Sequence, residues 1–510
     1  MHNMIVKAVI KPAEYHESVS LMLVARELAS QPGVQDAAVV MGTEANKSIL
    51  DGSGLFSAEL AAATANDLVL AVSAVDEPSA RQALEKADSL LKKKAAPESV
   101  GEFKPKTIRS ALSGQPDANL AVISVSGRFA ADEAWEALRH GLHVLLFSDN
   151  VSLADEIALK RYAVEHGLLL MGPGAGTAIL NGVALGFANV LPRGPVGIVS
   201  AAGTGLQEVS TLLARQGVGI TQGIGTGGRD LREAVGGRML RAGRQALQTD
   251  PDTQVIVLVS KPPAAAVADK IIAQAQQCGK PTVVCFMGDR QARRAVKTLR
   301  FVHTLEEAAQ AAAALAGAQP VLSPIPTVKP VHQSPGKLRG LFSGGTLCYE
   351  AQVIWRDLLP EPVLSNAPLD HANQMANSLD SHGHCAVDLG EEEFTVGRPH
   401  PMIDNDLRIR RLLQEARDPE VAVIILDVVL GYGAHPDPAS ELAPAIQKAL
   451  EMAHNAGRKL SVITSVTGTQ GDPQGLTTQI QKLEAAGAIV CPSNAAAARL
   501  VADLILGSAR

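Results

Sequence analysis

The chain has 510 residues, of which 46% are hydrophobic, 19% are charged and 3% are aromatic. This length exceeds what one hydrophobic core holds, and the composition is that of a folded protein, so we expect several domains and exclude wholesale disorder. The formal net charge of −6 and the few aromatic rings argue against a nucleic-acid surface, which needs clustered basic residues and stacking platforms.

Two further features concern the compartment. The sequence has no run of about 18 or more apolar residues and opens directly into an expected strand, so we expect neither membrane insertion nor export. The five cysteines are scattered and form no CxxC pair, which is typical of reduced thiols in a cytosol. We therefore expect a cytoplasmic protein that acts on a small molecule.

Residues 1–95 are predicted to form a small α/β accessory domain. The strands "IVKAVIKP" and "DAAVVMG" flank a helical segment, and the strand "DLVLAVSAV" is followed by the helix "SARQALEKADSLLKK". The polar stretch "AAPESVGEFKPKTIRSALSGQPD" is predicted to be a linker.

Three parallel α/β domains are predicted after this linker, over residues 107–192, 193–318 and 337–510. Continuous apolar strands such as "LHVLLFS" and "TQVIVLVS" alternate with helices of about ten to fifteen residues, which implies parallel sheets covered on both faces. The proline-dense stretch "QPVLSPIPTVKPVHQSPGK" is predicted to be a linker before the last domain.

A strand-to-helix corner occurs twice, in "GIVSAAGTGLQEV" and in "GLFSGGTLCYEA". Each has a strand that ends in Ser, a Gly-Thr at the helix start and a Glu four residues after the Thr. The later strands "DPDTQVIVLV" and "DPEVAVIILD" also match, so we interpret residues 193–318 and 337–510 as a duplicated domain type.

Helix starts at the carboxyl ends of parallel strands favour phosphate or carboxylate, because free N–H groups and the helix dipole point at the ligand. The alternative is a pair of glycine-rich turns that only pack. Neither corner is a P-loop or a dinucleotide GxGxxG, so the corners do not predict ATP or NAD binding. The candidate anion-binding residues are Gly203, Thr204, Gly205, Gly344, Gly345 and Thr346.

Long stretches resemble a known family. The segment 118–179, ending in "LLLMGPGAGTAIL", resembles the CoA-binding domain of the succinyl-CoA synthetase α subunit, and "GPVGIVSAAGTGLQEV" with "GIGTGGRD" resembles its ligase domain. The C-terminal domain resembles a ligase domain of the β-subunit type. The small N-terminal domain, "VLVSKPPAAA" and "FTVGRPHPMIDNDLR" resemble the FdrA family, a branch of the acyl-CoA synthetases.

The resemblance implies a fold of four parts: the small α/β domain, a Rossmann-like CoA-binding domain and two flavodoxin-like domains of the succinyl-CoA synthetase type. It also implies CoA as a candidate cofactor and phosphate as a candidate substrate. The residues that match the CoA-binding positions are Ser126, Gly127, Arg128, Gly172 and Gly174. Loss of CoA binding, with a vestigial pocket, is the alternative.

The departures from the synthetases concern the phosphoryl carrier. Those enzymes phosphorylate a His in a GHAGA-type loop, whereas this chain has "CFMGDRQARRAVKTLRFVHTLEEA", in which His303 does not match. Ser260 and Lys261 stand in the region where the family has the Glu that orients the phosphohistidine. The pattern therefore indicates anion-binding geometry without the phosphoryl carrier.

Four residues are candidates for catalysis. His400 and Arg398 lie in "GRPHPMIDNDLRIRR", where the imidazole would move protons and the guanidinium would hold an oxyanion. Arg229 follows the glycine loop of "GIGTGGRDL", and Lys261 follows a strand, so both cations would meet an anionic substrate. A capped helix, a loop-stabilising ion pair and ordinary packing of the lysine stem are the structural alternatives.

Two other polar stretches contain histidine. "DSHGHCAVDLGEEE" contains His382, His384, Cys385 and Asp388, but it lacks the ligand spacing of a zinc site, so a polar loop and no metal are predicted. "GYGAHPDPAS" follows a buried strand, so His435 and Asp437 are expected near the same edge of the last sheet.

Three functions remain open. The first is an FdrA-like subunit of a carbamoyl or acyl transferase of the oxamate carbamoyltransferase type, as the resemblance implies for purine and allantoin nitrogen catabolism. The second is an ADP-forming acyl-CoA synthetase that takes its nucleotide-binding domain from a partner. The third is a non-catalytic scaffold that binds CoA or an anion. Each predicts a small anionic ligand and an assembly with other subunits or with further copies of the chain.

Overall fold

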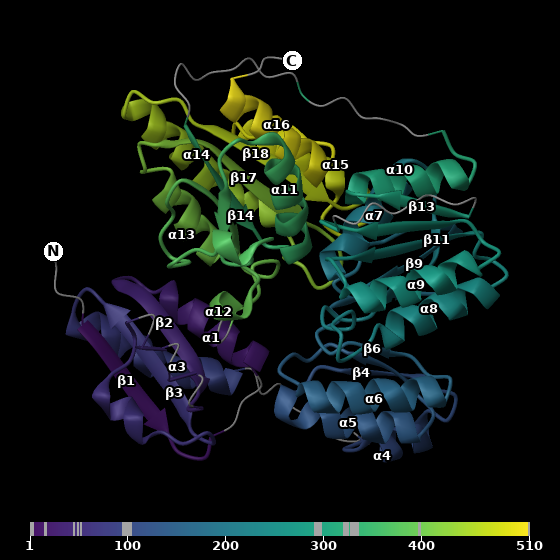
Figure 1. Cartoon of the computed structure of the whole chain (residues 1–510). Helices are drawn as coiled ribbons and strands as arrows, with labels where there is room; N and C mark the ends of the chain where they lie inside the picture. The colour runs from purple at the N-terminus through teal and green to yellow at the C-terminus, as the bar shows by residue number, and fades with distance from the viewer. Residues whose placement is uncertain are drawn as a thin grey trace. The chain divides into compact units, whose positions relative to one another are not determined.

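The computed structural model describes residues 5–14, 18–43, 46–47, 50–51, 54–93, 105–289, 298–319, 326, 336–395 and 399–507. Its contacts divide the chain into two compact units. One contains residues 1–104 and 391–400, and the other contains residues 105–390 and 401–510 (Figure 1). Each unit is described by itself.

The first unit contains a three-stranded sheet among its described residues, in the order β1-β3-β2. Both outer strands are antiparallel to β3. Alternate residues of β3 pack on opposite sides, with Leu68 and Leu70 toward the helices and Val69 and Ala71 toward η1. The elements are β1 (Ile5–Lys11), α1 (Ser18–Ala29), β2 (Val34–Met41), η1 (Ala58–Ala62), β3 (Leu68–Ala74) and α3 (Glu77–Lys93).

The second unit begins with α4, which corrects the predicted linker. Thr107 caps this helix because its side chain accepts from the backbone N–H of Ser110, and the Ser110 side chain accepts in return. Parallel strands follow in the order β4-β5-β6. The bounds are α4 (Ile108–Gly114), β4 (Leu120–Ile123), α5 (Gly127–Arg139), β5 (His143–Leu146), α6 (Leu153–Glu165) and β6 (Leu170–Met171).

The next sheet has seven described strands in the order β13-β12-β11-β9-β10-β7-β8. Strands β9 to β13 are mutually parallel. The hairpin β7–β8 adds to the β10 edge, although its residues precede the predicted boundary at 192. The strands are β7 (Thr177–Leu180), β8 (Val183–Gly186), β9 (Arg193–Ser200), β10 (Ile220–Gly225), β11 (Val255–Ser260), β12 (Thr282–Phe286) and β13 (Leu299–Val302).

Helices cover both faces of this sheet, as the continuous apolar strands predicted. Helices α8 and α9 pack on one face, and α7 and α10 pack on the other (Figure 1). The bounds are α7 (Gly203–Arg215), α8 (Arg238–Thr249), α9 (Ala265–Gln276) and α10 (Leu305–Leu315).

The last sheet has six described strands, all parallel, in the order β15-β16-β14-β17-β18-β19. Without β15, this order repeats that of β10-β9-β11-β12-β13, which is the 2-1-3-4-5 order of flavodoxin-like folds. The predicted pair of flavodoxin-like domains is confirmed. The strands are β14 (Lys337–Phe342), β15 (Val363–Ser365), β16 (His384–Asp388), β17 (Val421–Val429), β18 (Ser461–Thr467) and β19 (Ile489–Cys491).

Helices α11 and α16 pack together on this sheet, and their residues join the same core as those of α7 and α10. The remaining elements of the second unit are η2 (His371–Asn373), α11 (Gly345–Leu358), α13 (Asp406–Glu415), α14 (Pro438–Asn455), α15 (Leu476–Ala485) and α16 (Asn494–Leu506). The short helix α12 (Glu392–Thr395) belongs to the first unit.

The prediction of a polar loop at "DSHGHCAVD" is wrong for its second half. Residues 384–388 form β16, which pairs with β14 and β15. Its polar ends are buried because they have partners: His384 Nδ1 accepts from the Leu338 N–H, and the Asn366 side chain pairs with the Asp388 backbone. The predicted linker after residue 319 lies outside the described residues, apart from residues 326 and 336.

Candidate functional site

The two repeated corners occupy equivalent places in the two large sheets. The first corner, residues 200–205, joins β9 to α7, and the second corner, residues 342–347, joins β14 to α11. In each sheet the corner strand is the one at which the strand order reverses. Open α/β sheets bind ligands at the carboxyl ends of strands at such a switch point, so the topology favours both corners as ligand sites.

The two corners pack directly on each other through threonine and glycine. A Cβ atom placed on Gly344 would lie 2.9 Å from Thr204 Cγ2 and 3.0 Å from its Oγ1. A Cβ atom placed on Gly205 would lie 2.9 Å from Thr346 Cγ2. The packing alternative therefore accounts for Gly205 and Gly344, because no larger residue fits at either position without displacing its neighbour.

The first corner is open at the start of its helix. Gly203 is exposed, and a Cβ atom placed on it would meet only Thr177 Oγ1, at 3.5 Å. Ala202, the N-cap residue, contributes no side-chain cap, and the Ser200 hydroxyl accepts from the Ala202 N–H. The start of α7 thus presents backbone donors beside an accessible glycine, which is the arrangement that suits a small anion.

The second corner is lined by carboxylates of the chain itself. Asp427 accepts hydrogen bonds from the N–H of Ser343 (2.7 Å), the Ser343 hydroxyl (2.9 Å) and the N–H of Gly344 (2.8 Å). A Cβ atom placed on Gly345 would lie 2.4 Å from Asp388 Oδ2. Negative charge already lies against the donors of this corner.

Arg408 balances the charge of Asp427. Its guanidinium lies 3.1 Å from Asp427 Oδ1, and both side chains are buried. Burial lowers the pKa of Arg408, and Asp427 counteracts that effect. The oxyanion that Arg408 holds is therefore the carboxylate of Asp427.

The repeated glutamates link the two domains reciprocally. Glu208 of α7 accepts from the N–H of Asn494, the first residue of α16, at 3.0 Å and from the Thr467 hydroxyl. Glu350 of α11 accepts from the N–H of Leu305, the first residue of α10, at 2.6 Å. Each corner helix therefore caps the last helix of the other domain.

Both glutamates are buried, and this alters their protonation. Burial and the charge of Glu208 raise the pKa of Glu350 to about 8. Burial also raises the pKa of Glu208, while the positive charge of Arg215 opposes this rise. Glu350 therefore carries a proton at neutral pH. The repeated Gly-Thr-x3-Glu spacing was the signal for this pair, but it did not reveal which helices the carboxyl groups cap.

Lys261 extends from the end of β11 toward α11 of the last domain. Its Nζ lies 5.4 Å from the centroid of the Tyr349 ring of α11, and burial raises the pKa of Tyr349 to about 12. Val259 of β11 pairs with Ser200 of β9, so Lys261 follows the strand beside the first corner. The structure thus brings Lys261 to the same sheet edge as Gly203 and Thr204.

Arg229 belongs to a charged network between α6 and the glycine loop. Arg229 Nε lies 2.8 Å from Glu156 Oε2, and its NH2 group donates to the Val151 carbonyl at 2.8 Å. The buried Lys160 lies 2.8 Å from Glu156 and 2.9 Å from Asp230. This is the geometry of the loop-stabilising alternative, and Arg229 keeps a 30% exposed side chain.

The candidate CoA-binding glycines converge on the end of β5 and the loop after it. A Cβ atom on Gly127 would lie 2.1 Å from the Asp149 carbonyl oxygen, and one on Gly172 would lie 2.2 Å from the Leu146 carbonyl oxygen. Gly174 approaches the Asp149 side chain in the same way. Ser126 and Arg128 are exposed at the start of α5, where their polar groups are accessible to a phosphate.

The predicted catalytic set is divided between the two units. His400 lies in the first unit, whereas Arg229, Lys261 and both corners lie in the second. Arg398 lies outside the described residues. His435 lies between β17 and α14, and its Nε2 is 2.9 Å from Glu441 Oε1.

Asp437 caps α14. Burial opposes the ionisation of Asp437, but hydrogen bonds from Lys482, Gln479 and Ser440 lower its pKa overall.

Within the described residues, no three His, Cys, Asp or Glu side chains gather as a metal site, and no helix has the length and apolar character to cross a membrane. Burial lowers the pKa of His384, whose Nδ1 accepts from a backbone N–H.

The chain is 43% identical over 513 aligned residues to Uncharacterized protein YahF of Escherichia coli (strain K12), with 98% of this chain and 99% of that protein covered. The chain belongs to the YahF family. Residues 341–504 match the CoA-ligase family, and residues 4–106 match the AllF heavy metal-associated domain family. Residues 4–106 of this chain contain no cysteine.

Ligase subunits are further relatives of this YahF-family chain. The ADP-forming sulfoacetate-CoA ligase subunit SauD of Bilophila wadsworthia (strain 3_1_6) is 26% identical over 36% of this chain and 64% of its own length. The succinate–CoA ligase [ADP-forming] subunit alpha of Methanothermobacter thermautotrophicus is 28% identical over 29% of this chain and 51% of its own length. The chain is acyl-CoA-synthetase-like. These matches support the ligase alternative and not carbamoyl transfer. They do not show membership of the FdrA family by name.

Proposed function

We propose that this chain is an acyl-CoA-synthetase-like ligase component that transfers the acyl group of a small carboxylic acid between phosphate and CoA, with the nucleotide handled by a partner subunit. The observation that carries the proposal is the second corner. It lies within the CoA-ligase match, and it packs directly on its own repeat in the first corner. The ADP-forming ligase subunits among the relatives support the same reaction class.

The first corner is the proposed phosphate site. The exposed start of α7 at Gly203 offers backbone donors, and Lys261 supplies a cation at the same sheet edge. When a thiol attacks the carbonyl carbon of an acyl phosphate, the carbon–oxygen bond to phosphate breaks and the phosphate leaves with the bond's electron pair. Donors fixed before the reaction stabilise that developing charge without reorganising.

The start of α5 is the proposed CoA site. Ser126 and Gly127 stand at the helix N-terminus, and Arg128 is exposed beside them, so these residues fit a phosphate group of CoA. CoA supplies the thiol that accepts the acyl group. The close approach of Gly127 to the loop after β5 holds the α5 start in place.

Transfer in the reverse direction needs no nucleotide and therefore tests the isolated chain. Acetyl-CoA or succinyl-CoA would be mixed with the protein and inorganic phosphate, and free CoA thiol would be measured. The cysteines of the chain are buried, which keeps the background low. We expect phosphate-dependent thiol release that falls at least tenfold in Lys261→Met. The control Lys270→Met removes an exposed lysine of α9 and is expected to behave as the wild type.

Release that does not depend on phosphate, or equal loss in both lysine variants, would contradict the proposal. A parallel arm with oxalurate and phosphate measures carbamoyl phosphate. Carbamoyl phosphate formed in that arm, without thiol release from acyl-CoA, would instead support the FdrA-like carbamoyl transferase. Saturable CoA binding without turnover in either arm would indicate the scaffold.

A further inference from the structure

The free edge of β1 in the first unit lies in a groove of about 640 Å³. Strand β1 is the outer strand of its sheet, because β3 pairs with it on one side only within the described residues. Consecutive residues from Val6 to Val9 all line the groove. Since neighbouring residues of a strand face opposite sides of the sheet, such a groove must run over the free edge itself.

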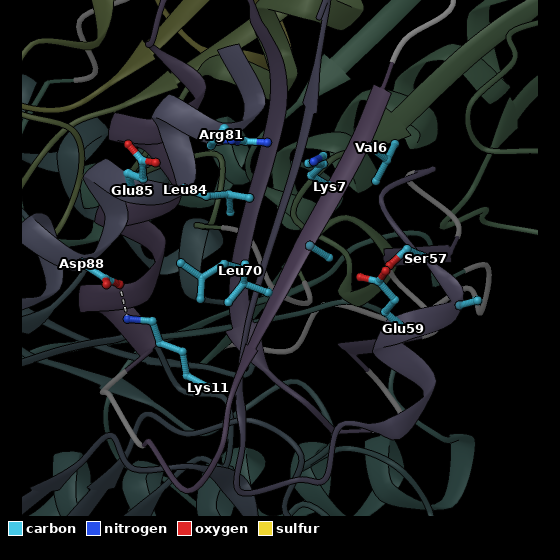
Figure 2. Close-up of a pocket in the computed structure, with 13 residues that line it drawn as sticks. Val6, Lys7, Lys11, Ser57, Glu59, Leu70, Arg81, Leu84, Glu85 and Asp88 are labelled. Carbon is cyan, nitrogen blue, oxygen red and sulfur yellow. Dashed lines mark hydrogen bonds and ion pairs between the residues drawn. The ribbon is translucent and has the colours of Figure 1, made fainter. Parts of the chain in front are cut away.

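Two walls flank this edge. Arg81, Leu84, Glu85 and Asp88 of α3 form one wall, and residues 57–59 at η1 form the other (Figure 2). The backbone of β1 directs alternate N–H and C=O groups away from β3 and into the space between the walls. A slot with an unpaired strand edge at its base and a wall on each face has the shape that receives one added β-strand.

The charged side chains that line the groove, three cations and three carboxylates, differ in how many are paired with described residues. The cations are engaged: Lys7 lies 2.5 Å from Glu77, Lys11 pairs with Asp88 (dashed in Figure 2), and Arg81 lies 3.4 Å from Glu77. Glu59 and Glu85 form no ion pair with any described residue, and both are exposed. Each wall thus presents one unpaired carboxylate, and the region between them on the α3 side is apolar at Leu70 and Leu84.

We propose that this edge binds an extended, basic segment of a partner protein as a fourth strand of the sheet. In such a segment an apolar side chain lies over Leu70 and Leu84, and lysine or arginine side chains reach Glu59 and Glu85. A second copy of β1 fits less well. Its own lysines are already paired, and it brings two further unpaired glutamates to the same place.

The test uses the full chain and a labelled probe peptide, Lys-Lys-Val-Lys-Lys-Lys-Val-Lys. When extended, it presents lysine and valine in turn on one face and lysine alone on the other. Fluorescence anisotropy is expected to show saturable binding, and the matched valine–glutamate peptide is expected not to bind. The double variant Glu59→Lys, Glu85→Lys is expected to weaken binding at least tenfold. The control Asp132→Lys, Glu133→Lys changes net charge equally at exposed positions of α5 and is expected to bind as the wild type.

Hydrogen exchange at the β1 amides separates strand addition from loose electrostatic attraction. We expect alternate amides between Ile5 and Lys11 to exchange at least tenfold more slowly with saturating probe peptide. Equal weakening by both double variants, or no change in exchange, would overturn the proposal. Slow exchange of every β1 amide before peptide is added would also overturn it, because the edge would then be filled by another segment or by a second copy.

Discussion

The first corner leaves Gly203 exposed at the start of α7, whereas the second corner holds the start of α11 against the carboxylates of Asp427 and Asp388. The two are alike where they pack: each contributes a threonine that lies on a glycine of the other, and each has a glutamate four residues later that caps a helix of the other domain. They differ in what faces their backbone donors.

This difference indicates a division of roles after duplication. The second corner is complete within the chain, because Asp427 and Arg408 supply both the anion and its counterion. The first corner presents its donors to solvent and has Lys261 at the same sheet edge. An external anion is therefore expected at the first corner, with the second corner serving as its rigid support.

The largest expected effect comes from Asp427. Asp427→Ala would leave the buried Arg408 without its charge partner and would remove the acceptor for the N–H groups of Ser343 and Gly344. Removing one partner of a buried pair costs about 3–5 kcal/mol, so the free energy of unfolding in urea is expected to fall by that amount. The double variant Asp427→Leu, Arg408→Met is expected to regain part of it. A loss below about 1 kcal/mol in the single variant would contradict this account.

A smaller loss is expected from filling the contact between the corners. Gly205→Val would place methyl groups against Thr346 Cγ2 and Val259 Cγ1, and overpacking of this kind costs about 1–3 kcal/mol. The matched variant Gly203→Val adds the same side chain two residues earlier, where only Thr177 Oγ1 lies within 4 Å. Thermal unfolding is expected to separate the two variants. Equal melting temperatures would show that the corners do not pack as described.

The reciprocal glutamates predict a dependence on pH. Because the folded pKa of Glu350 is raised to about 8, its proton stabilises the fold fully below about pH 4.5. That contribution is lost as pH rises toward 8, by about 1.4 kcal/mol per pH unit for one proton. Glu350→Gln is expected to flatten the decline of the unfolding free energy between pH 5 and 8. The exposed Glu133→Gln serves as control, and a profile unchanged by Glu350→Gln would exclude the buried proton.

Continuous apolar strands that alternate with helices, together with the repeated corner, were enough to predict the two parallel sheets and the helices between them. The strand β16 was missed because His384 and Asp388 look exposed in the sequence, and only their partners Leu338 and Asn366 make them compatible with a core. The roles of Glu208 and Glu350 depend on helices far along the chain. The role of Arg229 could not be predicted either, because its partner Glu156 lies on the preceding domain.

Phosphate binding to Gly203 variants tests the central claim most directly. Gly203→Asp would place a carboxylate at the start of α7 and give the first corner the charge that the second corner already has, while Gly203→Asn has the same shape without charge. Titration calorimetry with inorganic phosphate is expected to show binding to the wild type and to Gly203→Asn, and binding at least tenfold weaker to Gly203→Asp at unchanged stability. Equal phosphate affinity in the Asp and Asn variants would contradict an anion site at the first corner.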